Sequence, residues 1–247
     1  MKKLVLGALI AATSFTGCTS DSGPDDPVVT DAVVTVSWNF THLATNAARS
    51  CPTGYTTATV ISQSIDPATH IGTGLKVKDK FDCSAGIGSL TLPDDTYLIW
   101  VEITDDGGTK FYAQTEEFFV DTTLGDKRFD TEILDDGGYV QMTWDLVDAH
   151  SGALLTCAAA GVKADGSVEI TPSMAGSMDF VSDKFTCEDH FGTTYGLLAG
   201  DYVLSVAVNP TDNVADQPLG DVQNVNNVQV KAPNVITYVG NIMLPID

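Results

Sequence analysis

Residues 79–83 read Asp-Lys-Phe-Asp-Cys and residues 183–187 read Asp-Lys-Phe-Thr-Cys, so four of the five letters recur after a step of 104 positions. Four further landmarks recur in the same order at steps of 105 or 106, namely Trp38 with Trp144, Cys51 with Cys157, Leu92 with Leu197 and Tyr97 with Tyr202. A constant order with so little drift indicates an internal duplication. The sequence therefore predicts two homologous domains, at residues 31–135 and 138–247.

Each copy consists of short segments in which apolar and polar residues alternate. Residues 33–38, 97–103 and 202–208 have the period and the β-branched and aromatic content of strands. No segment has a long amphipathic helical period, so the crossover helices that parallel sheets need are not offered. We therefore predict an all-β fold of two tandem antiparallel β-sandwich domains.

A local resemblance supports the same fold class. Residues 92–97 and 197–202 each place a leucine, a turn and then a tyrosine that opens an alternating strand. This pattern resembles the strand edge of immunoglobulin-like and transthyretin-like bacterial modules. The resemblance implies a fold family and no particular activity.

The cysteines follow the duplication. Four of the five lie within the two copies and allow three pairings in principle. Homologous domains should close homologous loops, which predicts the disulfides Cys51–Cys83 and Cys157–Cys187, with Phe81 and Phe185 packed inward. Zinc binding by these cysteines is the competing interpretation, but no Cys-x-x-Cys is present and an exported protein meets an oxidising compartment.

The fifth cysteine ends a targeting segment. Met1-Lys2-Lys3 precedes an apolar run at residues 4–12, which is too short to span a bilayer, and Gly17-Cys18 follows. This arrangement resembles the lipobox of bacterial lipoproteins. The resemblance implies a signal peptide at residues 1–17 and acyl chains such as palmitate on Cys18; a plain secretory signal is the alternative. Thr19, after the cysteine, fits export to the outer membrane, facing the periplasm or the surface.

Composition limits the partners of the mature chain. Residues 18–30 are polar and acidic, so they predict a flexible tether rather than a folded segment. The chain has 12 basic and 33 acidic residues and a net charge of −21. Nucleic acid is excluded as a natural partner because its binding needs clustered cations. Membrane attachment should depend on the lipid, since the protein surface would be repelled by anionic headgroups.

Motifs for catalysis are scarce. No Gly-x-Ser-x-Gly, His-Glu-x-x-His or phosphate-binding glycine loop occurs. Glu188-Asp189-His190 is a candidate metal or acid–base cluster, although the first copy has Ser84-Ala85-Gly86 at the matching place. The Asp-Asp-Gly-Gly stretches at 105–108 and 135–138 favour hairpin turns, with calcium binding as the alternative.

Two functional hypotheses remain. The first is a non-enzymatic, lipid-anchored envelope protein without a cofactor, which binds a protein or glycan partner or acts as a spacer. The second is an envelope enzyme, a metal-assisted hydrolase with its site in the second domain at Glu188, Asp189 and His190. A site present in one copy only should gather its polar groups in a concave pocket that the other copy lacks.

Overall fold

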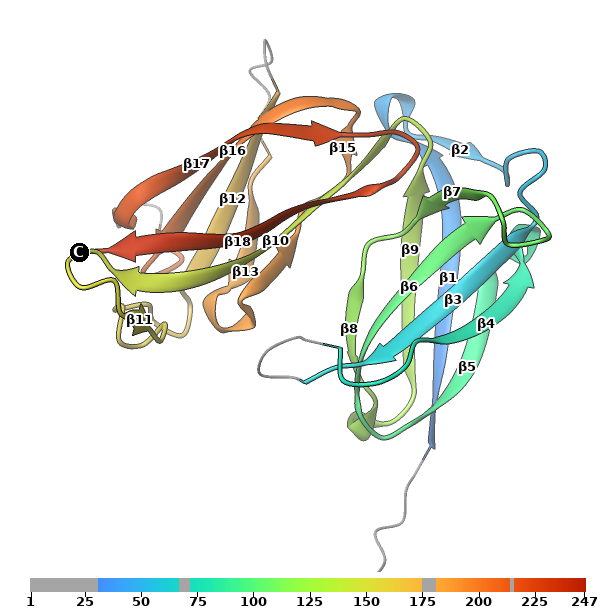
Figure 1. The fold of residues 1–247 in the computed structure, drawn as a ribbon, viewed down its shortest axis with the longest axis horizontal. Helices are drawn as coiled ribbons and strands as arrows, with labels where there is room; N and C mark the ends of the chain where they lie inside the picture. Colours follow the sequence, from blue (N-terminus) through green and yellow to red (C-terminus); the bar gives the residue numbers. More distant parts are fainter. Residues whose placement is uncertain (1–30, 67–71, 175–180, 214–215) are drawn as a thin grey trace, which may run out of the picture.

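The computed structural model describes residues 31–66, 72–174, 181–213 and 216–247. These residues form two all-β domains joined near residue 136 (Figure 1). The predicted signal peptide at 1–17, the lipidation site Cys18 and the tether at 18–30 lie outside the described residues. Within the described ranges, no helix has the length and apolar character needed to span a bilayer.

Domain 1 has two facing sheets. Its strands are β1 (Asp31–His42), β2 (Ala47–Arg49), β3 (Thr57–Ser64), β4 (Val77–Asp82), β5 (Ile87–Pro93), β6 (Thr96–Thr104), β7 (Phe111–Gln114), β8 (Phe118–Asp121) and β9 (Lys127–Leu134), with single 3₁₀ turns η1 (Leu43–Thr45), η2 (Cys83–Ala85) and η3 (Thr122–Leu124). In the first sheet β1 pairs with β2, β5 and β9, and in the second the order is β4-β3-β6-β7, with β8 also on β6.

Domain 2 repeats this plan. Its elements are β10 (Gly137–Asp148), β11 (Leu154–Leu155), β12 (Ser167–Met174), β13 (Asp183–Thr186), η4 (Cys187–Asp189), β14 (Phe191–Thr193), β15 (Leu197–Leu198), β16 (Gly200–Asn209), β17 (Leu219–Val230) and β18 (Ile236–Ile246). Strand β10 pairs with β11, β14, β15 and β18, and the facing sheet has the order β13-β12-β16-β17. The predicted fold class, two tandem β-sandwiches, is confirmed.

One strand pair in each domain departs from the antiparallel expectation. Strands β1 and β9 run parallel, and so do β10 and β18. Two parallel strands need a long crossover connection, which is usually a helix. Because the sequence offers no such helix, we expected antiparallel pairs throughout. The strands of the facing sheet provide this connection instead, since the chain passes through all of them before it returns beside the first strand.

The two cores are built around the same residues. The Trp38 indole nitrogen donates to the carbonyl oxygen of Cys83 at 2.9 Å, and the Trp144 indole nitrogen donates to that of Cys187 at 3.2 Å. The ring centroid of Phe81 lies 6.3 Å from that of Trp38, and the corresponding distance in domain 2 is 6.0 Å. The matched tryptophans therefore occupy equivalent settings, as a duplication requires.

The disulfides close equivalent loops. Cys51 bonds to Cys83 and Cys157 to Cys187, at sequence separations of 32 and 30. Cys83 and Cys187 are each 2% exposed and join their core clusters. The repeated Lys-Phe-x-Cys thus ends an edge strand and fixes it to the facing loop, as the sequence predicted.

Candidate functional site

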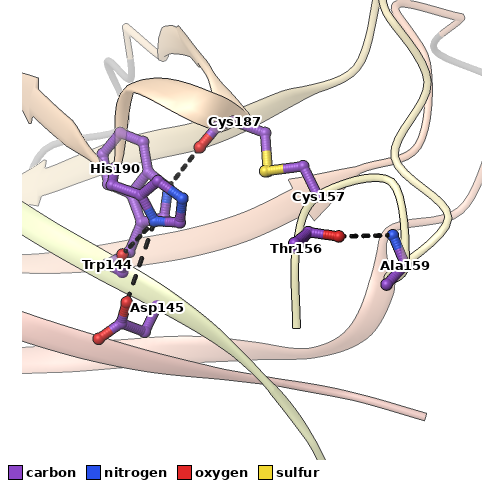
Figure 2. Close-up of a disulfide and its surroundings, with 7 residues drawn as sticks. All are labelled: Trp144, Asp145, Thr156, Cys157, Ala159, Cys187 and His190. Carbon is purple, nitrogen blue, oxygen red and sulfur yellow. Dashed lines mark hydrogen bonds and ion pairs between the residues drawn. A yellow bond between two sulfur atoms is a disulfide. The ribbon is translucent and has the colours of Figure 1, made fainter. Parts of the chain in front are cut away.

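The predicted cluster Glu188-Asp189-His190 lies in the turn η4 and its cap. Figure 2 shows His190 of this cluster beside Trp144, Asp145 and the Cys157–Cys187 disulfide. His190 has a left-handed backbone, with φ of 52°, and Gly86 has φ of 65° at the matching position of domain 1. Nδ1 of His190 lies 3.0 Å from the Trp144 carbonyl oxygen and 4.0 Å from Asp145 Oδ1. The imidazole therefore donates to the backbone of β10 and helps to fix the turn.

This turn does not assemble a three-ligand metal centre. Ligand atoms of Cys157, Glu188 and His190 lie within 4.8 Å of one another. Cys157 is in a disulfide and has no thiolate to offer. Two ligands remain, whereas a catalytic zinc site has three protein ligands. Asp189 is exposed and is not part of this group.

The two Asp-Asp-Gly-Gly stretches have different structures. The Asp105 carboxylate accepts hydrogen bonds from the backbone amides of Lys110 and Thr109, at 3.0 and 2.6 Å, and from the Thr109 hydroxyl at 2.8 Å. The Lys110 amide and then the Thr109 hydroxyl contribute most to holding the pKa of Asp105 below its usual range. That stretch is the hairpin turn expected between β6 and β7. The stretch 135–138 is no hairpin, because it links β9 to β10 and carries the chain from one domain to the other.

Glycines at this link permit close packing of backbones. A Cβ on Gly137 would lie 2.2 Å from the carbonyl oxygen of Leu197, and one on Gly138 would lie 2.7 Å from that of Val235. Neither glycine has a positive φ, so close approach and not turn geometry explains them. The sequence did not reveal this role, since Asp-Gly is also the usual hairpin signal.

Asp136 anchors domain 1 at the link. Its carboxylate accepts the amides of Leu43 and Ala44 at 2.7 and 2.9 Å and lies 3.0 Å from His42 Nδ1. Partial burial acts to raise the pKa of Asp136, but the two amides and His42 outweigh it and leave the pKa below the usual range. His42, Asp135 and Asp136 also place ligand atoms within 4.8 Å of one another. Arg49 Nε donates to Asp135 at 3.1 Å, so a cation already occupies this group.

Asn234, on the turn between β17 and β18, bonds domain 2 to domain 1. Its backbone N–H donates to the Leu134 carbonyl oxygen at 3.0 Å, and its backbone carbonyl oxygen accepts from the Gln114 backbone N–H at 3.0 Å. Its side-chain Nδ2 donates to the Gln114 carbonyl oxygen. Asn234 is fully buried. No sequence signal marked this residue, because its two partner residues, Leu134 and Gln114, lie 100 and 120 positions away in the chain.

Side chains extend the contact between the domains. Glu117 accepts from the Tyr238 hydroxyl at 2.9 Å and from Gln141 Nε2 at 3.0 Å. The rings of Phe119 and Phe191 meet edge to face with centroids 4.6 Å apart. The domains are therefore held by backbone hydrogen bonds, charge-assisted hydrogen bonds and an aromatic contact together.

Two carboxyl groups from different domains have raised pKa values here. Burial, followed by the charges of Asp183 and Glu132, raises the pKa of Glu116 to about 7. Burial also raises the pKa of Asp183 to about 6, against a hydrogen bond from the Tyr195 amide at 3.1 Å. Burial and the Glu116 and Glu132 charges raise the pKa of Tyr139 as well. Within the described ranges, neither Glu116 nor Asp183 has an ion-pair partner.

No protein-family model and no curated protein matches the sequence. Among solved structures, the chain is similar to a leucine-rich repeat protein from Bacteroides thetaiotaomicron, with 15% identity, a TM-score of 0.39 and coverage of 87% of this chain and 26% of that one. It is also similar to GBS52, a minor pilin of Streptococcus agalactiae (13%, TM-score 0.30, coverage 87% and 98%), and to the fimbrial anchor protein Mfa2 of Porphyromonas gingivalis (12%, TM-score 0.27, coverage 80% and 82%). The chain thus spans about a quarter of the first of these proteins. With TM-scores below 0.5, these likenesses carry no argument about function.

Proposed function

We propose that the chain is a lipid-anchored protein of the bacterial cell envelope, without enzymatic activity, whose two sandwich domains act as one unit in binding a protein or glycan partner. The acyl chains on Cys18 attach it to the outer membrane, and residues 18–30 give the folded part its reach. The proposal rests on the lipobox resemblance for location and on the junction for mode of action.

The Asn234 contact is the observation that carries this proposal. A flexible pair of domains would be expected to meet through a small, solvated interface. Here three hydrogen bonds made by one fully buried residue join the domains, and separation of the domains would exchange them for bonds to water. Two modules fixed in this way present a constant surface to a partner, or a constant length if they serve as a spacer.

The chemistry of the described residues favours binding over catalysis. The Glu188-Asp189-His190 turn offers two ligands, Glu188 and His190, and Nδ1 of His190 already donates to the backbone of β10. In the acidic group at the link, Asp135 already pairs with Arg49, and Asp136 already contacts His42. Neither arrangement leaves a nucleophile beside a base, which hydrolysis by side chains would need.

Location and binding are tested separately. Intact mass spectrometry of the membrane-extracted protein should show loss of residues 1–17 and a mass increase from acyl chains, and Cys18→Ser should release the protein from the membrane fraction. An unmodified wild-type mass would overturn the lipid anchor. The purified protein would then be screened against peptidoglycan, envelope glycans and envelope proteins; if none bound, the spacer role would remain.

A further inference from the structure

A mostly apolar cavity opens where domain 2 meets domain 1. It has a volume of about 350 Å³ and is lined in domain 2 by Met174 of β12, Asp183 of β13, Leu197 of β15 and Tyr202 of β16, and in domain 1 by Leu43. A Cβ on Gly196, beside it, would lie 2.5 Å from Leu134 of domain 1. The open end of one sandwich is therefore closed by the other domain only in part.

Asp183 is an unusual lining residue for such a place. It pairs with Ile170 across β12 and β13, so it lies on the core-facing side of its strand, and it is 5% exposed. Among the described residues, its carboxylate receives one hydrogen bond, from the Tyr195 amide. A buried carboxylate without a cation is costly, and the charge of Asp183 is one of the causes that raise the pKa of Glu116 in domain 1.

The duplication provides an internal comparison. Asp79, the matching residue in the repeated Asp-Lys-Phe-x-Cys, also lies on the core-facing side of its strand, opposite Val60. Asp79 is half-buried, whereas Asp183 is buried and lines the cavity at the junction. The aspartate of the repeat therefore acquires an enclosed, apolar setting only at the junction.

From this juxtaposition we propose that the cavity binds a lysine side chain of a partner protein, whose ammonium pairs with Asp183 while its methylene stem lies against Leu43, Met174 and Leu197. This inference names the partner chemistry for the proposed binding function and rests on it. Lysine combines a long apolar stem with a terminal charge, which matches a cavity with apolar walls and one buried carboxylate. A metal ion fits less well, because neither Asp183 nor Glu116 belongs to a group of three ligand atoms within 4.8 Å of one another among the described residues.

The rim points to a protein rather than a free amine. Val181 and Tyr195 line the mouth and are 64% and 69% exposed. A partner backbone that carries the lysine would cover both side chains, whereas a small amine would leave them in water. The net charge of −21 would also favour encounter with a basic partner surface.

The test uses the exported full chain carrying Cys18→Ser, with both disulfides formed, and NMR of its methyl groups. An acetylated Gly-Lys-Gly amide should shift the Met174 and Leu197 methyl signals saturably at pH 8, and the norleucine analogue should not. Asp183→Asn should weaken the lysine peptide about tenfold or more, the worth of a charged hydrogen bond. Asp79→Asn removes the same charge from the matching strand and should leave the affinity unchanged.

Three results would overturn the inference. Equal affinities for Asp183→Asn and Asp79→Asn would show that binding reflects net charge alone, and the absence of saturable shifts would show that the cavity does not accept an ammonium. Butylammonium binding as tightly as the peptide would assign the cavity to free amines. None of these results depends on lipidation, so the lipid anchor stands or falls by its own experiment.

Discussion

Removal of either disulfide should cost nearly the same stability, because the two bonds close loops of nearly equal length. With separations of 32 and 30 residues, the chain-entropy relation gives about 3.7 kcal/mol for each bond and a difference below about 0.1 kcal/mol. Both bonds end at a buried cysteine whose carbonyl oxygen accepts from a core tryptophan, so this end of each bond has the same setting; at the other end Cys157 is buried and Cys51 is partly buried. The double variants Cys51→Ala/Cys83→Ala and Cys157→Ala/Cys187→Ala therefore form a matched pair.

Hydrogen exchange measured by mass spectrometry resolves the loss by domain, with each variant as the control for the other. We expect protection to fall in the strands of the altered domain by the equivalent of about 3–4 kcal/mol, with a much smaller change in the other domain. The reasoning would be refuted if the two variants differed by more than about 1 kcal/mol. It would also be refuted if the intact domain lost as much protection as the altered one, since each module would then not be self-contained.

Three further perturbations address the junction. The pKa of Glu116 is raised from 4.5 to about 7, so the unfolded state loses this proton at lower pH and the free energy of unfolding should fall as pH rises from about 4 to 7. At about 1.4 kcal/mol per pKa unit, Glu116→Gln should recover up to about 3 kcal/mol at pH 8, and its urea midpoints should change less with pH across that window. A variant that kept the wild-type pH profile would contradict the assignment. Gly138→Ala places a Cβ against two carbonyl oxygens and should lower the free energy of unfolding by about 1–3 kcal/mol in thermal or urea unfolding. The control Gly107→Ala, whose Cβ would meet no atom closer than 3.7 Å, should lower it by less than about 0.5 kcal/mol. Equal losses would count against close packing at the link. Asn234→Ala removes the Nδ2 hydrogen bond to Gln114 and should lower the free energy of unfolding by about 1–3 kcal/mol. The control Asn241→Ala, at an exposed asparagine of β18, should change the same unfolding curve little. An Asn234→Ala variant of wild-type stability would show that this side chain does not hold the domains together.

The repeat made the domain plan and the cysteine pairing predictable. Trp38 and Trp144, or Cys83 and Cys187, keep their order and spacing because each copy must complete its own core and close its own loop. Period-two alternation likewise identified the strands at 97–103 and 202–208, which are parts of β6 and β16. These features are local or repeat locally, so one sequence suffices to show them.

The junction could not be predicted in the same way, because its contacts are made once and between distant residues. Asn234 resembles any loop asparagine in the sequence, and its role depends on Gln114 and Leu134 of the other domain. Gly137 and Gly138 carried the letters of a hairpin turn but allow backbones to approach. Asp183 matches Asp79 in the repeat, yet Asp183 is buried beside a cavity to which Leu43 of the other domain contributes.

The fixed junction between sister modules is tested most directly by the distance between the domains in solution. Spin labels at exposed positions Lys78 and Asp165, one in each domain, would be measured by double electron–electron resonance in the protein with both disulfides intact. The structure predicts one narrow distance distribution, which Asn234→Ala broadens. A broad or multimodal distribution in the wild-type protein would show that the domains move independently and would contradict the account.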